Sequence, residues 1–268
     1  MSLSEKTKLQ YENIYSIIEK SFDGKVDYED TEKVMSIIKT KKDGKSVSDW
    51  TLKNRLVALT HKSDNKVYKD ELKKITSKIR KVTESEEANK QKEGEFTFDD
   101  FNKLFNSVEG IEKMIIGLYL LNPPRRITDY TEMIVKQTRP SRMNPETNYL
   151  VLDEKLFVFN NYKTRHIYNR QIVPIADSLF KLLENQVQEN NHLLINKFSN
   201  KKFTEAQFSD YLRRLSVKHI GKPSSVTAFR HAYISNFLST NPSTSQRKLI
   251  SEMMAHNVAQ QLDYDRRV

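Results

Sequence analysis

The stretch "AFRHAYISNFL" (228–238) decides how the second half of the chain folds, because a charge lies within its helical apolar pattern. At about 100° per residue, Phe229, Ile234 and Phe237 share one broad face of a helix. Arg230 falls on the same face, between Phe237 and Ile234. An unpaired guanidinium is very costly to bury. We therefore expect Arg230 to meet an anion, supplied by the protein or by a ligand.

The composition is typical of a folded protein with room for two modest domains. The chain has 268 residues, of which 37% are hydrophobic and 30% are charged, enough to form real cores. It holds no run of about 18 apolar residues and no apolar signal segment near its first residue. We therefore expect neither a membrane span nor secretion. The chain has no cysteine, which excludes disulfides, thiolate metal sites and cysteine nucleophiles.

The charge balance is strongly basic, with a formal net charge of +10. An excess of this size favours a polyanionic partner, most commonly nucleic acid. A lysine-rich but otherwise ordinary surface would give the same count. If the partner is nucleic acid, the anion that Arg230 needs is a phosphate group.

Residues 1–83 predict a bundle of about four helices, since four successive segments repeat apolar residues at helical spacing. The loop "KTKKDGKS" (39–46) between two of these helices is basic. It either lies in solvent or contacts phosphates. Its candidate phosphate-binding residues are Lys39, Lys41, Lys42 and Lys45.

A polar stretch separates this bundle from the rest of the chain. Residues 84–95, "TESEEANKQKEG", carry no apolar residue except Ala88, which predicts a linker or an exposed helix end. We therefore place a helical domain at 1–92 and a second domain at 93–268.

The second domain is predicted to be mainly helical with a small antiparallel sheet, an α+β fold. Short runs of β-branched and aromatic residues at 149–152, 156–159 and 170–175 are separated by turn residues and predict three strands. Helical patterns precede them and follow them as far as Tyr264.

Common catalytic motifs are absent from the sequence. The histidines lack the spacing of a metal site. The chain has neither a phosphate-binding loop of the G-x-x-x-x-G-K-[ST] type nor a G-x-S-x-G nucleophile turn. We therefore expect no metal and no other cofactor.

An ordered series of basic residues followed by a tyrosine remains. It comprises Arg126 with Asp129 in "RRITD", Lys163 in "YKT", Arg230 in "TAFRH", His256 in "MAH" and Tyr264 in "DYD". In this order the residues resemble the catalytic domain of the tyrosine recombinases, the phage integrase family. The first domain is similar to the helical, SAM-like core-binding domain of that family. The "NPPRR" context is most similar to recombinases of large DNA viruses and mobile elements.

The resemblance implies a site-specific recombinase or integrase that cleaves and rejoins double-stranded DNA. The family forms a covalent 3′-phosphotyrosine link, which stores the bond energy, so that rejoining needs neither ATP nor a metal. The resemblance also implies a homo-oligomer, a tetramer on DNA, inside the cell in the cytoplasm or nucleus, wherever the target DNA lies. Viral genome integration is one activity of this kind.

The resemblance also assigns roles to the matched residues. Arg126 and Arg230 clamp the non-bridging phosphate oxygens, a task suited to the guanidinium fork. Tyr264 is the nucleophile and Lys163 protonates the departing 5′-hydroxyl. His256 donates to a phosphate oxygen or assists proton transfer.

Further residues are expected to support these groups. Asp129 orients an arginine, a task that His231 shares. Arg125 contacts DNA in this interpretation, although it is also the alternative to Arg126 as the first clamp. Thr227 stands where the family usually has histidine or lysine, and its hydroxyl can donate to a phosphate but cannot shuttle protons near neutral pH.

Two other departures concern the end of the chain. Ala255 replaces a common glycine, so we expect the turn there to differ. His256 and Tyr264 are eight positions apart (264 − 256), one fewer than usual, and Asp265 occupies the usual place of the tyrosine. These departures leave three alternatives open: a non-catalytic DNA-binding relative, a type IB topoisomerase that relaxes supercoiled DNA, and a basic helical scaffold protein.

Overall fold

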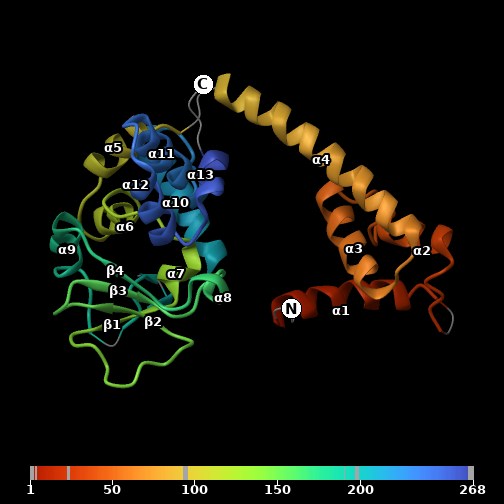
Figure 1. Cartoon of the computed structure of the whole chain (residues 1–268), viewed down its shortest axis with the longest axis horizontal. Helices are drawn as coiled ribbons and strands as arrows, with labels where there is room; N and C mark the ends of the chain where they lie inside the picture. Colours follow the sequence, from red (N-terminus) through yellow and green to blue (C-terminus); the bar gives the residue numbers. More distant parts are fainter. Residues whose placement is uncertain are drawn as a thin grey trace. The chain divides into compact units, whose positions relative to one another are not determined.

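The chain forms two compact units, Met1–Gly94 and Glu95–Val268. They are seen in a computed structural model (Figure 1) that describes residues 3, 5–22, 25–92, 96–189, 191–196 and 199–264. The division between the units falls two residues after the domain boundary that we expected at 92. The polar stretch before it is helical up to residue 92.

The first unit contains the four expected helices. They are α1 (Glu5–Glu19), α2 (Thr31–Lys39), α3 (Asp49–Lys62) and α4 (Lys66–Lys92). Their apolar faces meet in one core, in which the side chains of Ile18, Val34, Ile38, Leu56 and Leu59 are fully buried. This burial explains why the spacing of apolar residues in the sequence predicted these helices correctly.

The basic loop after α2 is a tight hairpin. Thr40 and Ser46 form an isolated β-bridge, and Gly44 takes a left-handed φ of 79°, which glycine adopts without steric cost. The Arg55 guanidinium donates to the carbonyl of Thr40 at 3.1 Å. The hairpin is therefore held to α3 by its first residue.

The second unit contains a four-stranded sheet in the order β1-β2-β3-β4. Its strands are β1 (Met133–Lys136), β2 (Asn148–Val151), β3 (Leu156–Phe159) and β4 (Gln171–Pro174). The last three match the predicted strands and pair antiparallel. The first was not predicted and runs parallel to β2, so the sheet is mixed. A two-stranded ribbon joins β5 (Ile195–Asn196) to β6 (Lys201–Lys202).

Helices cover this sheet and form most of the unit (Figure 1). They are α5 (Phe98–Ser107), α6 (Gly110–Leu120), α7 (Ile127–Thr131), α8 (Arg165–Tyr168), α9 (Asp177–Leu183), α10 (Glu205–Ile220), α11 (Val226–Ser239), α12 (Thr244–Met253) and α13 (Val258–Tyr264). The α+β fold class is therefore confirmed.

Helix α11 is the centre of the second unit. The Phe229 ring stacks on the Phe101 ring of α5 with centroids 4.4 Å apart, and the Ile234 side chain is fully buried. Arg230 lies between these buried residues in sequence and is itself only 2% exposed. The charged residue is therefore buried, as the helical pattern predicts.

Within the described ranges, no helix is both long enough and apolar enough to cross a membrane.

Candidate active site

The Arg230 guanidinium is buried among neutral groups. It donates to the carbonyl of Pro124 at 2.9 Å and contacts His256 Nδ1 at 3.3 Å. Its central carbon lies 5.1 Å from the centroid of the Tyr264 ring. Among the described residues, none of the recorded ion pairs brings a carboxylate within 4 Å of Arg230. The expected protein carboxylate is therefore absent from its contacts there, and burial lowers the pKa of Arg230.

The His256 imidazole is held in one tautomer by its neighbour. A guanidinium can only donate, so Nδ1 of His256 accepts from Arg230 and Nε2 carries the proton. Nε2 is buried and has no hydrogen-bond partner in the described part of the chain. Burial lowers the pKa of His256 to about 3, helped by the positive charges of Arg230 and Arg126. The ring is therefore neutral at pH 7 and presents an unused N–H donor.

The Tyr264 ring lies against the same groups. Its centroid is 5.5 Å from that of His256, with the two planes 22° apart, and 4.9 Å from that of His231. His231 Nδ1 donates to the backbone carbonyl of Tyr264 at 3.1 Å. The short spacing between His256 and Tyr264 therefore does not keep this tyrosine away from Arg230. Asp265, the alternative position, lies outside the described residues.

The two adjacent arginines before α7 have different surroundings. Arg125 is only 1% exposed, and its Nε donates to Asp129 at 2.9 Å. Arg126 is half-buried, and its only recorded hydrogen bond, 3.5 Å long, goes to the Ala255 carbonyl. The prediction that Arg125 contacts DNA is therefore wrong, because its guanidinium faces the interior. Asp129 orients Arg125 and not Arg126.

The turn before His256 has the conformation that favours glycine. Ala255 adopts a φ of 52° and is fully buried. An L-residue there costs about 1–2 kcal/mol. Our expectation of a different turn is therefore wrong, because alanine keeps the left-handed conformation that glycine would take.

Lys163 lies in the connection between β3 and β4. Its side chain is exposed and makes no recorded hydrogen bond or ion pair within the described residues. The next residue, Thr164, donates its hydroxyl to the Ala255 carbonyl at 3.0 Å. The structure thus brings the backbone of the lysine loop, but not the lysine side chain, into contact with the turn before His256. Thr227 is exposed at the start of α11.

The expected contacts in the basic hairpin have different degrees of freedom. Lys39 pairs with Glu71 at 3.3 Å, and Lys45 approaches Asp43 at 3.8 Å. Lys41 and Lys42 are exposed and have no recorded ion pair among the described residues. Their binding to phosphate stays a prediction.

Sequence reasoning missed three groups that hold the site together. Gln171 and Thr164 donate to carbonyls of the segment before His256, and the Pro124 carbonyl accepts from Arg230. No local pattern reveals them, because each acts on a residue more than 80 positions away. Position next to Lys163 is the one signal that singles out Thr164.

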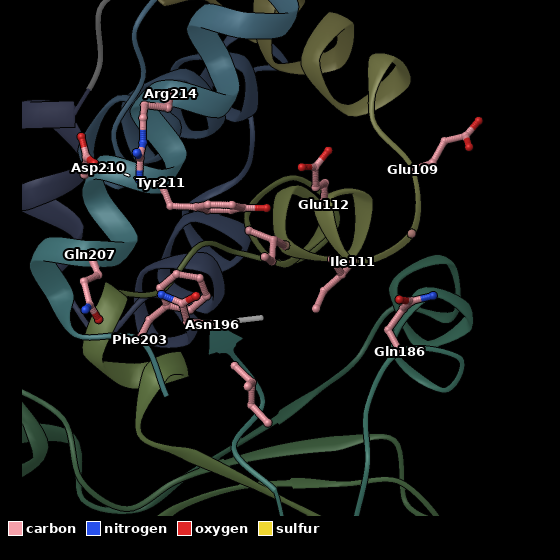
Figure 2. Close-up of a pocket in the computed structure, with 13 residues that line it drawn as sticks. Glu109, Ile111, Glu112, Gln186, Asn196, Phe203, Gln207, Asp210, Tyr211 and Arg214 are labelled. Atoms are coloured by element: carbon pink, nitrogen blue, oxygen red, sulfur yellow. Dashed lines mark ion pairs between the residues drawn. The ribbon is translucent and has the colours of Figure 1, made fainter. Parts of the chain in front are cut away.

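A separate pocket of about 910 Å³ lies between α6, α10 and β5 (Figure 2). Tyr211 extends into it from α10, and Glu112 lies at its edge on α6. Asp210 and Arg214 pair at 3.1 Å on α10. None of the residues that we predicted for the active site lines this pocket.

Comparison with known proteins identifies the fold. No family model matches the sequence, and none of the curated proteins matches it. Among solved structures, the Tn1549 transposon integrase in complex with circular intermediate DNA matches with a TM-score of 0.61 and 13% identity, covering 100% of this chain and 91% of that one. The same integrase in complex with transposon right end DNA matches with a TM-score of 0.54 and 11% identity, at the same coverage. The chain therefore has the fold of the tyrosine recombinases and integrases, as the resemblance of its sequence predicted.

Proposed function

We propose that this protein cleaves and rejoins double-stranded DNA as a tyrosine recombinase. One observation carries the proposal: the buried Arg230 guanidinium has only neutral partners, and it lies against His256 and Tyr264. A buried cation without a carboxylate is costly, and a phosphate group would remove that cost. The fold supports the same proposal, because the integrase structures with this fold are complexes with DNA.

The chemistry follows from the groups around Arg230. The Tyr264 oxygen bonds to the scissile phosphorus and its phenol proton passes to water, while the bond from phosphorus to the 5′-oxygen breaks. Lys163 gives a proton to the departing 5′-oxygen and becomes a neutral amine. Arg126, Arg230 and the Nε2–H of His256 donate to the non-bridging oxygens, where negative charge accumulates. Rejoining runs the same steps in reverse from the 3′-phosphotyrosine.

Arg126 is suited to the first clamp because its present contact is weak. A 3.5 Å hydrogen bond to a carbonyl is longer than the usual range and is easily exchanged for a charged phosphate oxygen. Arg125 is not suited, because its charge is paired with Asp129. The proposal therefore assigns phosphate binding to Arg126 and Arg230.

Assembly and biological role extend the proposal further. Recombination joins two duplexes, which requires about four active sites, so we infer a tetramer on DNA. The likeness to a transposon integrase favours a mobile element, and integration of a viral genome is a second setting for the same chemistry.

The test uses a duplex with a nick just downstream of the scissile phosphate, so that the freed 5′ fragment diffuses away and the covalent step is trapped. We expect a protein–DNA adduct on a denaturing gel, formed without metal and absent in Tyr264→Phe. Tyr168→Phe, a change at a half-exposed tyrosine of α8, is the matched control and keeps the adduct. An adduct that persists in Tyr264→Phe would show that another residue is the nucleophile.

Two alternatives give different results in the same laboratory. A non-catalytic relative, which the threonine at position 227 favours, binds the duplex but forms no adduct with the unaltered protein. A type IB topoisomerase forms the adduct on DNA of any sequence and relaxes supercoiled plasmid as a monomer.

A further inference from the structure

The carboxyl end of α12 is held by side chains from two other segments. The last four carbonyls of a helix lack partners within the helix. Here Gln171 Nε2 donates to the Glu252 carbonyl at 2.6 Å, and Arg125 Nη1 donates to the Met253 carbonyl at 2.9 Å. Thr164 takes the Ala255 carbonyl. His256 follows directly, so its position depends on these contacts.

Arg125 links most of these groups to one another. Its Nη1 also donates to Gln171 Oε1 at 2.6 Å, and its guanidinium carbon lies 4.6 Å from the centroid of the Tyr162 ring and 4.1 Å from that of Phe159. Tyr162 closes the lysine loop by donating its hydroxyl to the Asn169 carbonyl at 2.6 Å. One guanidinium therefore touches the base of the lysine loop and the turn before His256.

We propose that Arg125 is a positioning residue that fixes the loop bearing Lys163 relative to the segment that carries His256 and Tyr264. The inference rests on the proposed function, since it concerns delivery of the proton to the leaving 5′-oxygen. Lys163 has no recorded contact of its own in the described structure, so the groups on either side of it, Tyr162 and Thr164, determine where it lies. A flat fork that stacks and donates in several directions suits arginine and not lysine.

The proposal predicts a defect in one chemical step. In Arg125→Lys the charge opposite Asp129 remains, but a lysine cannot both stack on Tyr162 and reach the Met253 carbonyl. A displacement of about 1 Å of a catalytic group costs on the order of 10²-fold in rate. We therefore expect Arg125→Lys to slow cleavage of ordinary DNA by about that factor, through misplacement of Lys163.

A change of leaving group isolates that step. When sulfur replaces the bridging 5′-oxygen, the phosphorus–sulfur bond breaks and the thiolate departs without a proton, because its pKa is far below that of an alcohol. Single-turnover cleavage of this substrate does not need Lys163. We expect Lys163→Ala and Arg125→Lys both to recover to within about threefold of the unaltered protein on the sulfur substrate, since general acid catalysis supplies about 10²–10⁴-fold.

Three variants serve as comparisons. Thr164→Val removes one hydroxyl from the same network without touching a buried charge, and we expect a smaller loss that is also recovered with sulfur. Arg126→Lys weakens the phosphate clamp and should lose equally on both substrates. Arg139→Lys, in an exposed pair with Glu154, should change neither rate.

Equal loss by Arg125→Lys on both substrates would overturn the proposal, because a general structural defect does not depend on the leaving group. An unchanged rate on ordinary DNA would overturn it too. Failure of the proposed function has a different signature: the unaltered protein would form no adduct with either substrate while still binding the duplex.

Discussion

The two buried arginines make opposite predictions for stability. Arg125 and Arg230 are 1% and 2% exposed, yet only Arg125 has a recorded carboxylate partner in the described structure. We compare Arg125→Met with Arg230→Met, since methionine keeps much of the side-chain volume and adapts to irregular space. The comparison tests whether the anion for Arg230 comes from the protein or from a ligand.

The expected magnitudes follow from what each change leaves behind. Arg125→Met leaves the carboxylate of Asp129, which is 0% exposed, without its cation. Breaking a buried pair in this way costs about 3–5 kcal/mol. Arg230→Met leaves one carbonyl and one imidazole nitrogen without a donor, which costs about 1–3 kcal/mol each, but it removes a desolvation penalty of several kcal/mol. We therefore expect Arg230→Met to be within about 2 kcal/mol of neutral.

Calorimetry of the full chain measures the difference. One kcal/mol shifts the melting temperature of a unit of this size by roughly 2–4 °C, so Arg125→Met should melt about 10 °C lower. The single tryptophan, Trp50, lies in the first unit, so its fluorescence transition should not move in either variant. An equally large loss in Arg230→Met would refute the reasoning, because it would mean that the protein itself supplies the anion.

Three further predictions concern other parts of the molecule. Because burial lowers the pKa of His256 from 6.5 to about 3, the unfolded chain binds the extra proton between those values, so stability should fall as pH drops through that window; His256→Gln should flatten this slope in urea titrations at several pH values. Ala255→Gly should leave the melting temperature unchanged or slightly raised, since relief of the left-handed strain of about 1–2 kcal/mol offsets the loss of a buried methyl group of about 0.8 kcal/mol. If the basic hairpin binds DNA, Lys41→Glu and Lys42→Glu should each weaken binding and reduce the slope of log affinity against log salt by about 1, whereas Lys8→Glu on α1 should not, as filter binding at several salt concentrations would show.

Much of the fold follows from patterns that a short window contains. Helix α11 was predicted because its apolar residues repeat with a period of about 3.6, and β3 because four apolar residues lie between turn signals. Strand β1 was missed because it has four residues and pairs parallel to β2 across a long connection. Such pairing depends on contacts distant in sequence, which no local pattern records.

The candidate site was predictable in its order but not in its register. Either of two adjacent arginines can face inward from the start of a five-residue helix, and a spacing of three or four residues to Asp129 suits both. Packing against the Phe159 ring decides for Arg125. The sequence pattern thus identified Arg126 as a clamp but associated it with the wrong partner for Asp129.

The distribution of this carboxylate gives the site its capacity for an anion. Asp129 neutralises Arg125, and the groups that hold Arg230 are a carbonyl and a neutral imidazole. Had Asp129 paired with Arg230, a phosphate would have to displace a carboxylate before it could bind. Because buried charges are screened by salt much less than exposed ones, the attraction of Arg230 for a phosphate should persist at ionic strengths that abolish contacts from exposed lysines. Salt should therefore weaken encounter with DNA more than it slows the chemical step once DNA is bound.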